Sequence, residues 1–390
     1  MPSVLIAPDK FKGSLTADAV ARAVADGLLA AAPHTRVTTL ALADGGEGSV
    51  AAACTGRFRA EEVVVTGPTG EPVTATVAVD GRTVLVEAAA VCGLGVLPGG
   101  RPAPLTATSR GIGQALHHAL AGGADTIVLA LGGVATTDGG AGLLQSLGAV
   151  LARADGTPIG PGGHGLADLH TVDLTEARAA LAGVDLVLAT DVDNPLLGAH
   201  GTAAVYGPQK GATPDDVRAL DAALTGFVRR LEAAGVPDAA ALARTAGAGA
   251  AGGLGYAGML LGGRLRSGAD YFLTLLGADE LLADADLVVT GEGSLDEQSL
   301  SGKLPVALAR RARRQGVPVH AVAGRCTLTP EQTAANFRSV QALTDLTDQD
   351  CATDSALSAR LLTRYGRALA ERWIDGCGEE AAPAARLTLT

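Results

Sequence analysis

The chain has 390 residues, a length typical of two domains that each bury a core of their own. Its formal net charge of −11, with no run of basic residues, argues against a nucleic-acid partner. No segment has the long uncharged apolar run of a membrane span, and the N-terminus lacks the basic and apolar regions of a signal peptide. Five cysteines without a CxxC pair or zinc-ligand spacing predict reduced thiols in a cytoplasmic protein.

The first segment, residues 1–66, has the pattern of alternating strands and helices. Strands are predicted near 3–8 and 36–42, with a helix over 16–32 that carries an apolar stripe of 3.6-residue period. The first strand ends in a basic turn, Pro8-Asp9-Lys10-Phe11-Lys12-Gly13-Ser14. The second ends in an acidic, glycine-rich turn, Asp44-Gly45-Gly46-Glu47-Gly48.

The alternation of strands and helices gives way to a different pattern near residue 67. A hairpin about Asp80-Gly81 is predicted within 72–88, and another about Asp155-Gly156. Further along lie a helix at 110–121, buried strands at 126–131 and 185–190, and helices over much of 213–285.

From residue 286 the alternation of the start returns. Strands are predicted at 286–290, 318–323 and 337–343, and helices at 303–315 and 354–374. We therefore expect residues 1–66 and 286–390 to form a flavodoxin-like, doubly wound parallel-sheet domain, with 67–285 inserted as a second α/β domain. The active site is expected in the cleft between them. Residues 378–390 are expected to be a frayed end.

The stretch 286–303, DLVVTGEGSLDEQSLSGK, is predicted to be a buried strand that ends in the acidic turn Thr290-Gly291-Glu292-Gly293 before a helix. A flavodoxin-like order places this strand beside the first strand of the chain, so that the acidic turn and the basic turn of Lys12 meet. Carboxylates suit Mg²⁺ and lysines suit phosphate.

Acidic residues at predicted strand ends are the main candidates for a site. Each alone is more simply a turn residue or a helix cap, but six together favour a shared site. They are Asp44, Asp138, Asp191, Asp193, Glu292 and Asp296.

Anion-binding candidates lie elsewhere. Thr108-Ser109, before the helix at 110–121, would offer free backbone N–H groups, although a simple N-cap is an equal alternative. Arg325 follows the strand at 318–323. Lys10 is the weaker lysine of its turn, and Lys210 is predicted to lie on the surface.

Several common nucleotide-binding and catalytic motifs are absent. Two GxGxxG matches, beginning at Gly247 and Gly253, follow no predicted strand and are interpreted as close helix packing or a flexible loop. There is no Walker A sequence and no GxSxG nucleophile elbow. Carboxylates, lysines and glycine-rich loops without a nucleophilic triad favour phosphoryl transfer from ATP. Two alternatives remain: a nicotinamide-dependent hydroxy-acid oxidoreductase and a two-lobed small-anion-binding protein.

Five motifs carry a resemblance to a known family. APDKFKGSLTA at 7–17, ADGGEGS at 43–49, GGVATTDGGAG at 132–142, TDVDNPLLG at 190–198 and TGEGSLDEQSLSGK at 290–303 resemble the bacterial glycerate kinase family of the garK type. The resemblance covers nearly the whole chain. It implies a flavodoxin-like domain with an inserted α/β domain, and phosphorylation of D-glycerate with ATP and Mg²⁺, usually to 2-phosphoglycerate, with the 3-phosphate described for some members.

The family's motifs map onto single positions of this chain. From their positions at strand ends and the sign of their charges, we hypothesise that Lys12 clamps the transferring phosphate, that Glu292 and Asp296 hold Mg²⁺, and that Asp191 accepts or orients the glycerate hydroxyl proton. Thr108-Ser109 or Arg325 is expected to hold the substrate carboxylate. Further substrate- and phosphate-binding positions are Ser14, Asp44, Asp138, Asn194, Gly291 and Gly293. Lys10 and Arg110 depart from the family's usual residues. The expected partners are glycerate and ATP, and a homodimer is left open.

Overall fold

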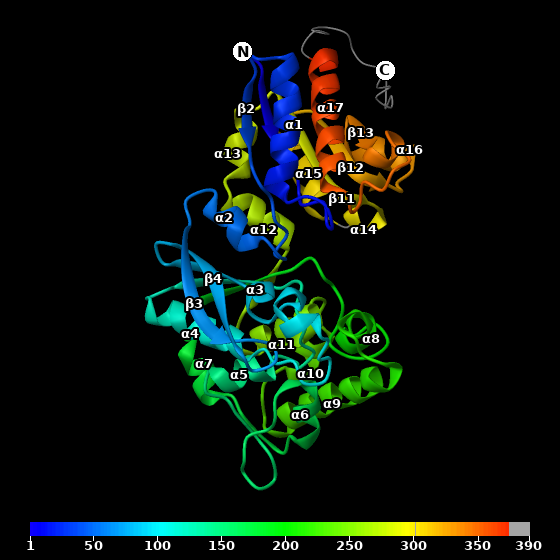
Figure 1. Ribbon diagram of the computed structural model, residues 1–390. Helices are drawn as coiled ribbons and strands as arrows, with labels where there is room; N and C mark the ends of the chain where they lie inside the picture. The colour runs from blue at the N-terminus through cyan, green and yellow to red at the C-terminus, as the bar shows by residue number, and fades with distance from the viewer. Residues whose placement is uncertain (301, 374–390) are drawn as a thin grey trace. The chain divides into compact units, whose positions relative to one another are not determined.

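The computed structural model describes residues 1–300 and 302–373, and divides the chain into two units. Unit 1 comprises Met1–Asp44 and Ala269–Thr390, and unit 2 comprises Gly45–Gly268. The expected frayed end, 378–390, lies outside the described residues. Unit 1 is thus built from the two ends of the chain, with unit 2 inserted between them (Figure 1).

Unit 1 contains a five-stranded parallel sheet. Its strand order is β13-β12-β11-β1-β2, the flavodoxin-like order that the sequence predicts. The strands are β1 (Ser3–Ile6), β2 (Arg36–Thr39), β11 (Leu287–Leu295), β12 (Val319–Cys326) and β13 (Ser339–Ala342). The chain winds to one side of β1 through β2 and to the other through β11, so the topological switch point lies between β1 and β11.

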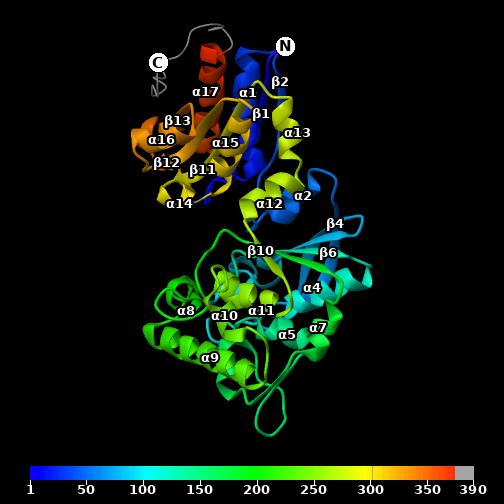
Figure 2. The same ribbon diagram turned by 180° about the vertical axis from the view of Figure 1, so that it is seen from behind.

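Apolar side chains on both faces of this sheet explain why helices cover both. Val4 and Ile6 of β1 join one core with α1 and α17, while Leu5 lies in a second core with α15. Helices α1 and α17 lie side by side in Figures 1 and 2. Gly27 allows this, because a Cβ there would lie 1.9 Å from the carbonyl oxygen of Thr363. The helices of this unit are α1 (Ala17–Ala31), α12 (Gly268–Leu275), α13 (Ala278–Ala283), α14 (Glu297–Leu300), α15 (Leu304–Arg314), α16 (Pro330–Asn336) and α17 (Ser355–Trp373).

Unit 2 contains a six-stranded mixed sheet in the order β10-β9-β6-β5-β4-β3. Strands β5, β6, β9 and β10 are parallel to one another. Strands β3, β4 and β5 form an antiparallel meander, and the turn between β4 and β5 is the predicted Asp80-Gly81 hairpin. The strands are β3 (Arg59–Thr66), β4 (Pro72–Asp80), β5 (Thr83–Glu87), β6 (Thr126–Ala130), β9 (Asp185–Ala189) and β10 (Arg264–Arg266). A separate pair joins β7 (Val150–Ala152) to β8 (Thr171–Asp173). The predicted hairpin about Asp155-Gly156 forms as a short turn, with one antiparallel bridge between Ala152 and Pro158 and a hydrogen bond of 2.8 Å from the Arg153 N–H to the Thr157 carbonyl oxygen.

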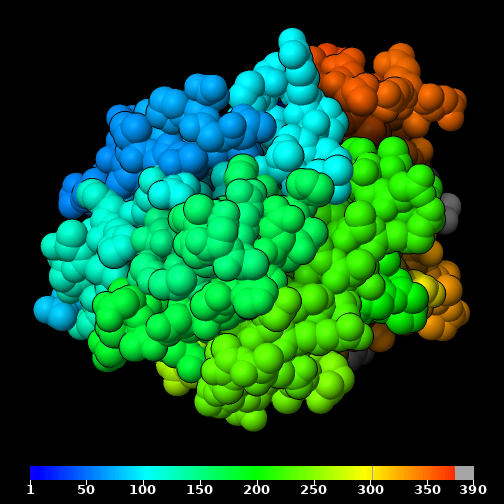
Figure 3. All heavy atoms as spheres, turned by 90° about the horizontal axis from the view of Figure 1, so that it is seen from below, coloured from blue at the N-terminus to red at the C-terminus, as the bar shows by residue number. Residues whose placement is uncertain are grey.

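Helices of unit 2 pack against this sheet over one large apolar core. Figure 2 shows α4, α5 and α11 close to the sheet strands, and Figure 3 shows the green segment of the chain, which includes α9, covering one end of the unit. The helices are α2 (Ser49–Cys54), α3 (Ala88–Cys92), α4 (Arg110–Ala121), α5 (Ala141–Ser146), α6 (Gly162–Gly165), α7 (Thr175–Ala180), α8 (Thr202–Tyr206), α9 (Pro214–Ala233), α10 (Ala239–Arg244) and α11 (Leu254–Leu260).

The boundaries of the units differ from the expected ones at 66/67 and 285/286. Strand β3 pairs with β4 and so belongs to the sheet of unit 2, and α12 and α13 pack into a core of unit 1. The prediction that the active site lies in a cleft between two domains stays a prediction. None of the described helices is long and apolar enough to cross a membrane. The four described cysteines are unbridged, and Cys377 lies outside the described residues.

Candidate functional site

The switch point of unit 1 brings together the basic and acidic segments that the sequence singles out. Beyond the paired residues Ile6 and Val289, the backbone N–H of Asp9 donates to the carbonyl oxygen of Gly291 at 2.8 Å. Ligands of open α/β sheets bind at the carboxyl ends of strands at such a point. This edge of the unit 1 sheet is therefore the first candidate site.

Lys12 lies on a tight turn at this edge. Phe11 and Leu15 exchange two backbone hydrogen bonds of 2.9 and 3.0 Å, and Gly13 has a φ of 94°, which favours glycine. The buried ring of Phe11 anchors the turn, while Lys12 is exposed and Ser14 is half-buried. A Cβ on Gly293 would lie only 3.1 Å from the backbone nitrogen of Lys12, so the two turns lie in contact.

The acidic segment is a strand rather than a turn. Strand β11 continues to Leu295 instead of ending near Thr290, because residues 288–292 and 294–295 pair with β12. Gly291 allows this close approach, since a Cβ there would lie 1.9 Å from the carbonyl oxygen of Val322. The prediction of a Gly-rich turn at 290–293 is thus wrong, and the two glycines serve strand packing at the carboxyl end of the sheet.

Three carboxylates lie near one another at this edge of the sheet: Asp44 in the segment after β2, Asp9 after β1, and Glu292 within β11. Burial is the main cause that raises the pKa of Glu292 to about 7; Asp296 and Asp44 raise it further, while Ser299 and Lys303 lower it. Burial and the negative charges of Asp44 and Glu292 likewise raise the pKa of Asp9 to about 7. Asp9 is not among the six acidic candidates chosen from the sequence, although it follows a predicted strand as Asp44 does.

Asp296 and Arg325 lie further along β11 and β12. Asp296 accepts the Gln298 N–H at 3.0 Å and the Ser294 hydroxyl at 3.3 Å, so its carboxylate caps α14. Arg325 is exposed and donates from Nε to the same Ser294 hydroxyl at 3.0 Å. Asp296 follows Glu292 closely in the chain. Arg325 lies close to Glu292 in the sheet, because Arg325 pairs with Ser294 in the register of β11 and β12.

Asp138 of unit 2 is a fully buried carboxylate that links two loops. It accepts the backbone N–H and the hydroxyl of Ser109, both at 2.8 Å, and the N–H groups of Gly140 and Gly142 at 3.0 and 3.3 Å. Burial still raises its pKa, although these four donors lower it. Thr108 is also buried and accepts the Arg110 N–H at 3.2 Å. Asp138 therefore fixes the start of α4 against the loop that precedes α5.

Lys210 is buried, which corrects the prediction of a surface lysine. Only 3% of it is exposed, and Nζ donates to the carbonyl oxygen of Thr136 at 2.6 Å and to the Thr137 hydroxyl at 3.4 Å. Burial lowers its pKa to about 8, against the opposing charges of Cys92 and Asp138. The glycines of the GxGxxG matches pack closely against neighbouring backbone and side chains. A Cβ on Gly252, for example, would lie 2.0 Å from the Thr136 carbonyl oxygen.

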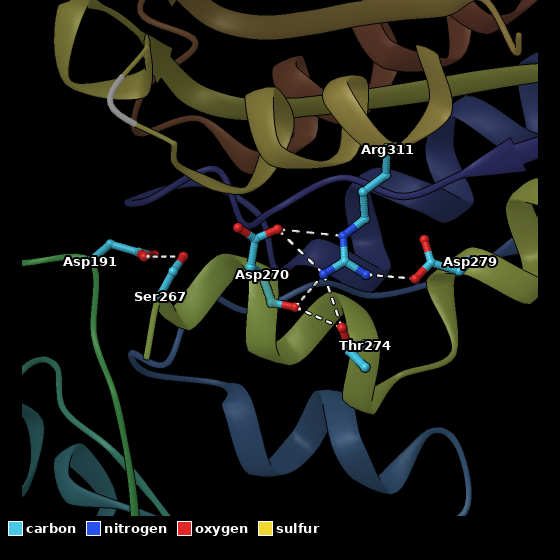
Figure 4. A network of polar contacts seen from close by, with 6 residues as sticks. All are labelled: Asp191, Ser267, Asp270, Thr274, Asp279 and Arg311. Atoms are coloured by element: carbon cyan, nitrogen blue, oxygen red, sulfur yellow. Dashed lines mark hydrogen bonds and ion pairs between the residues drawn. The ribbon is translucent and has the colours of Figure 1, made fainter. Parts of the chain in front are cut away.

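Asp191 and Asn194 follow β9 at the carboxyl edge of the unit 2 sheet. Asp191 is exposed and accepts the Ser267 hydroxyl at 2.8 Å, as Figure 4 shows. Asn194 donates to the His200 carbonyl at 2.9 Å and accepts the Tyr206 hydroxyl at 2.6 Å. Asn194 therefore shapes its loop, and Asp191 presents its carboxylate at the surface of the unit.

The described residues contain no ready-made metal site with three protein ligands. No three His, Cys, Asp or Glu side chains among them are arranged to hold a metal ion. Glu292 is nevertheless suited to bind a metal ion, because its Oε1 is buried and has no hydrogen-bond partner in the described structure. Mg²⁺ in nucleotide-dependent enzymes commonly takes one or two carboxylates and completes its shell with phosphate and water.

A doubly wound sheet with a lysine turn and buried carboxylates at its switch point has the features of a phosphotransferase. Comparison with known proteins identifies the family: the model described as "Glycerate kinase family" matches residues 4–374, and the chain belongs to that family and is a kinase. The resemblance inferred from the five motifs is confirmed.

The relatives agree in length as well as in sequence. The chain is 43% identical over 327 residues to the glycerate kinase of Bacillus subtilis (strain 168), covering 82% of this chain and 84% of that one. It is 40% identical over 328 residues to the glycerate 2-kinase of Escherichia coli (strain K12), covering 83% and 85%. A crystal structure assigned as glycerate kinase 2 from Salmonella typhimurium LT2 superposes with a TM-score of 0.80 at 37% identity, covering 97% of this chain and 100% of that chain.

Proposed function

We propose that this kinase transfers the terminal phosphoryl group of ATP to D-glycerate with Mg²⁺, giving 2-phosphoglycerate. The observation that carries the proposal is the 40% identity, over 83% of the chain, to a protein named glycerate 2-kinase. The contact between the Lys12 turn and the acidic strand β11 supports it, because phosphoryl transfer needs cations and metal-binding carboxylates at one place.

Lys12 is the proposed clamp for the transferring phosphoryl group. It is exposed at the carboxyl edge of the unit 1 sheet, and its backbone lies against Gly293. The ammonium group acts as a mobile point charge toward phosphate oxygens, while Ser14 and the strand-end glycines border the same edge. Arg325, exposed on β12, is a second cation available to an anionic group.

Glu292 is the proposed protein ligand of Mg²⁺, since its buried Oε1 has no other partner in the described structure. When bound, Mg²⁺ neutralises phosphate charge that builds up during transfer. A cation would also favour the ionised form of Glu292, whose pKa burial raises to about 7.

Asp191 is the proposed group that accepts the proton of the attacking hydroxyl. Its carboxylate is exposed, and the Ser267 hydroxyl orients one oxygen at 2.8 Å. Asn194 holds the surrounding loop through His200 and Tyr206. In unit 2, Asp138, Thr108 and Ser109 are proposed to support the substrate-binding loops, because Asp138 already accepts four hydrogen bonds.

The test is an ATP-coupled assay with D-glycerate, L-glycerate and other hydroxy acids, followed by assignment of the phosphorylated carbon with ³¹P NMR. Phosphate on the 3-position would refute the proposed product, and no transfer to D-glycerate would refute the substrate. Asp191→Asn should lower kcat on the order of 10²–10⁴-fold, the usual contribution of a positioned base. A near-normal kcat would remove Asp191 from that role. Asp125→Asn, which changes an exposed carboxylate before β6, is the control.

A further inference from the structure

The strongest unassigned feature of unit 1 is a pair of carboxylates, Asp9 just beyond the end of β1 and Glu292 within the neighbouring strand β11. We propose that Asp9 and Glu292, rather than Asp296, are the protein ligands of the divalent cation that enters with the nucleotide. This inference rests on the proposed metal- and ATP-dependent reaction, and it concerns which residues of this chain hold the cation.

The sheet register places Asp9 beside Glu292. Ile6 and Val289 are the last registered pair of β1 and β11; three residues further along the chain are Asp9, beyond the end of β1, and Glu292, within β11. The hydrogen bond of 2.8 Å from Asp9 N to Gly291 O keeps the two chains together beyond the end of β1. Both carboxylates therefore belong to one side of the switch point, next to the turn of Lys12.

Glu292 supplies an independent sign of a missing partner. Only 7% of the residue is exposed, and Oε1 is buried without any hydrogen-bond donor in the described structure. Leaving an ionised oxygen in this state is costly. Asp296, Asp44 and Asp9 are the negative charges near it, and Lys303 is the cation that opposes them. A divalent cation would supply the partner that Oε1 lacks.

Asp9 is a second carboxylate at the same place. Its Oδ1 accepts the backbone N–H of Lys10 at 2.7 Å, and the negative charge of Glu292 acts on it. Two protein carboxylates are also as many as the site can provide, because no three acidic side chains of the described chain are arranged to hold a metal. This number is usual for Mg²⁺ that shares its shell with nucleotide phosphates.

Asp296 already has a structural task. Its two oxygens accept the Gln298 N–H and the Ser294 hydroxyl, and its own N–H donates to Ser299 Oγ at 3.1 Å. These contacts are those of an N-cap at the start of α14. The residue that sequence position favours as a metal ligand is thus the one that the local structure uses as a cap.

The experiment measures binding of Mn²⁺ with the non-hydrolysable analogue AMPPNP by electron paramagnetic resonance, with no glycerate present. The variants are Asp9→Asn, Glu292→Gln and Asp296→Asn, with Asp9→Ser as a second variant at position 9. We expect the changes at positions 9 and 292 to weaken Mn²⁺ binding on the order of 10-fold or more, and Asp296→Asn to leave it within about 3-fold. Loss of binding with Asp296→Asn but not with Asp9→Asn would overturn the proposal, as would a wild-type protein that binds no Mn²⁺.

Thermal unfolding without metal provides a second readout. Asp9→Asn removes one of several neighbouring negative charges, so it should raise Tm in metal-free buffer and reduce the further rise that Mg²⁺ with AMPPNP gives to wild type. Asp296→Ala should lower Tm, because it removes the side chain that caps α14, and keep the ligand-induced rise. The reverse pattern would contradict the assignment. Since no glycerate is present, a failure of the proposed glycerate kinase reaction would leave these results unaffected.

Discussion

Replacing Lys210 with methionine tests whether a buried ammonium group costs stability. The substitution keeps an unbranched side chain of similar length and removes its positive charge. Lys210 is only 3% exposed. The wild-type ammonium contacts the Thr136 carbonyl at 2.6 Å and the Thr137 hydroxyl at 3.4 Å. These two contacts oppose the cost of burial.

The pKa of Lys210 gives the size of that cost. Burial lowers it from 10.5 to about 8. At ~1.4 kcal/mol per pKa unit, the charged form is disfavoured by roughly 3 kcal/mol in the folded state at pH 7. Methionine removes this cost but leaves the Thr136 carbonyl without its donor, which costs about 1–3 kcal/mol. We therefore expect Lys210→Met to be as stable as wild type at pH 7, or up to about 2 kcal/mol more stable.

The pH dependence has a defined sign. Because the folded pKa lies below the unfolded pKa, the folded protein releases the proton first, and between about pH 8 and 10.5 the unfolded state binds more protons. Wild-type stability should rise with pH across this window relative to the variant, by at most ~1.4 kcal/mol per pH unit. Below pH 8 the penalty is constant, so any advantage of Lys210→Met should be largest there.

Urea denaturation at pH 7, 8, 9 and 10 measures both effects. Arg229→Met on the exposed side of α9 is the control, and we expect its stability relative to wild type to be independent of pH in this range. The reasoning is refuted if Lys210→Met loses more than about 2 kcal/mol at pH 7, because the two polar contacts would then outweigh the burial cost. A difference that does not change between pH 8 and 10 would equally refute it.

Three further changes test other contacts. Arg311→Met should lower the free energy of unfolding by about 2–3 kcal/mol, because this largely buried guanidinium joins α15 to acidic side chains of α12 and α13 (Figure 4). Gly142→Ala should destabilise unit 2 by more than about 2 kcal/mol in urea denaturation, since its Cβ would lie 2.4 Å from Thr108 Oγ1. Ser267→Ala should lower kcat by no more than about 10-fold in the ATP-coupled assay, far less than Asp191→Asn, because it removes one neutral hydrogen bond.

Each of these changes has a matched control or a contrary outcome. Arg310→Met, on the exposed neighbour of Arg311, should cost less than about 1 kcal/mol, and equal losses would show that the network adds nothing. Gly226→Ala on α9, where a Cβ has open space, should stabilise by about 0.5–1 kcal/mol. A loss with Ser267→Ala as large as with Asp191→Asn would mean that orientation of the carboxylate, rather than its basicity, governs the rate.

The sequence predicts the sheet of unit 1 well because its signals are local. Buried apolar runs mark β1 and β11, and the flavodoxin-like order then requires them to be neighbours. The boundary between the units is harder to predict from the sequence. β3 follows the pattern of the first segment, but its partner β4 lies beyond the turn at 67–71, so only the pairing shows to which sheet it belongs. Likewise, Lys210 sits in a glycine-rich loop, and nothing local indicates the Thr136 carbonyl that receives its ammonium group.

The acidic candidates show most clearly which properties of a site residue its position in the sequence predicts and which it does not. Asp138, Glu292 and Asp296 all stand near glycines or serines after a strand, and the sequence treats them alike. Their hydrogen-bond donors differ: Asp138 accepts four, Asp296 accepts two in a helix cap, and Glu292 Oε1 accepts none. Donors hold a buried carboxylate such as Asp138 within the fold, whereas a buried carboxylate oxygen that lacks a donor is stabilised by a proton or by a cation from outside the chain. The number of donors, which depends on residues remote in sequence, therefore separates the supporting carboxylates from the one that is open to a ligand.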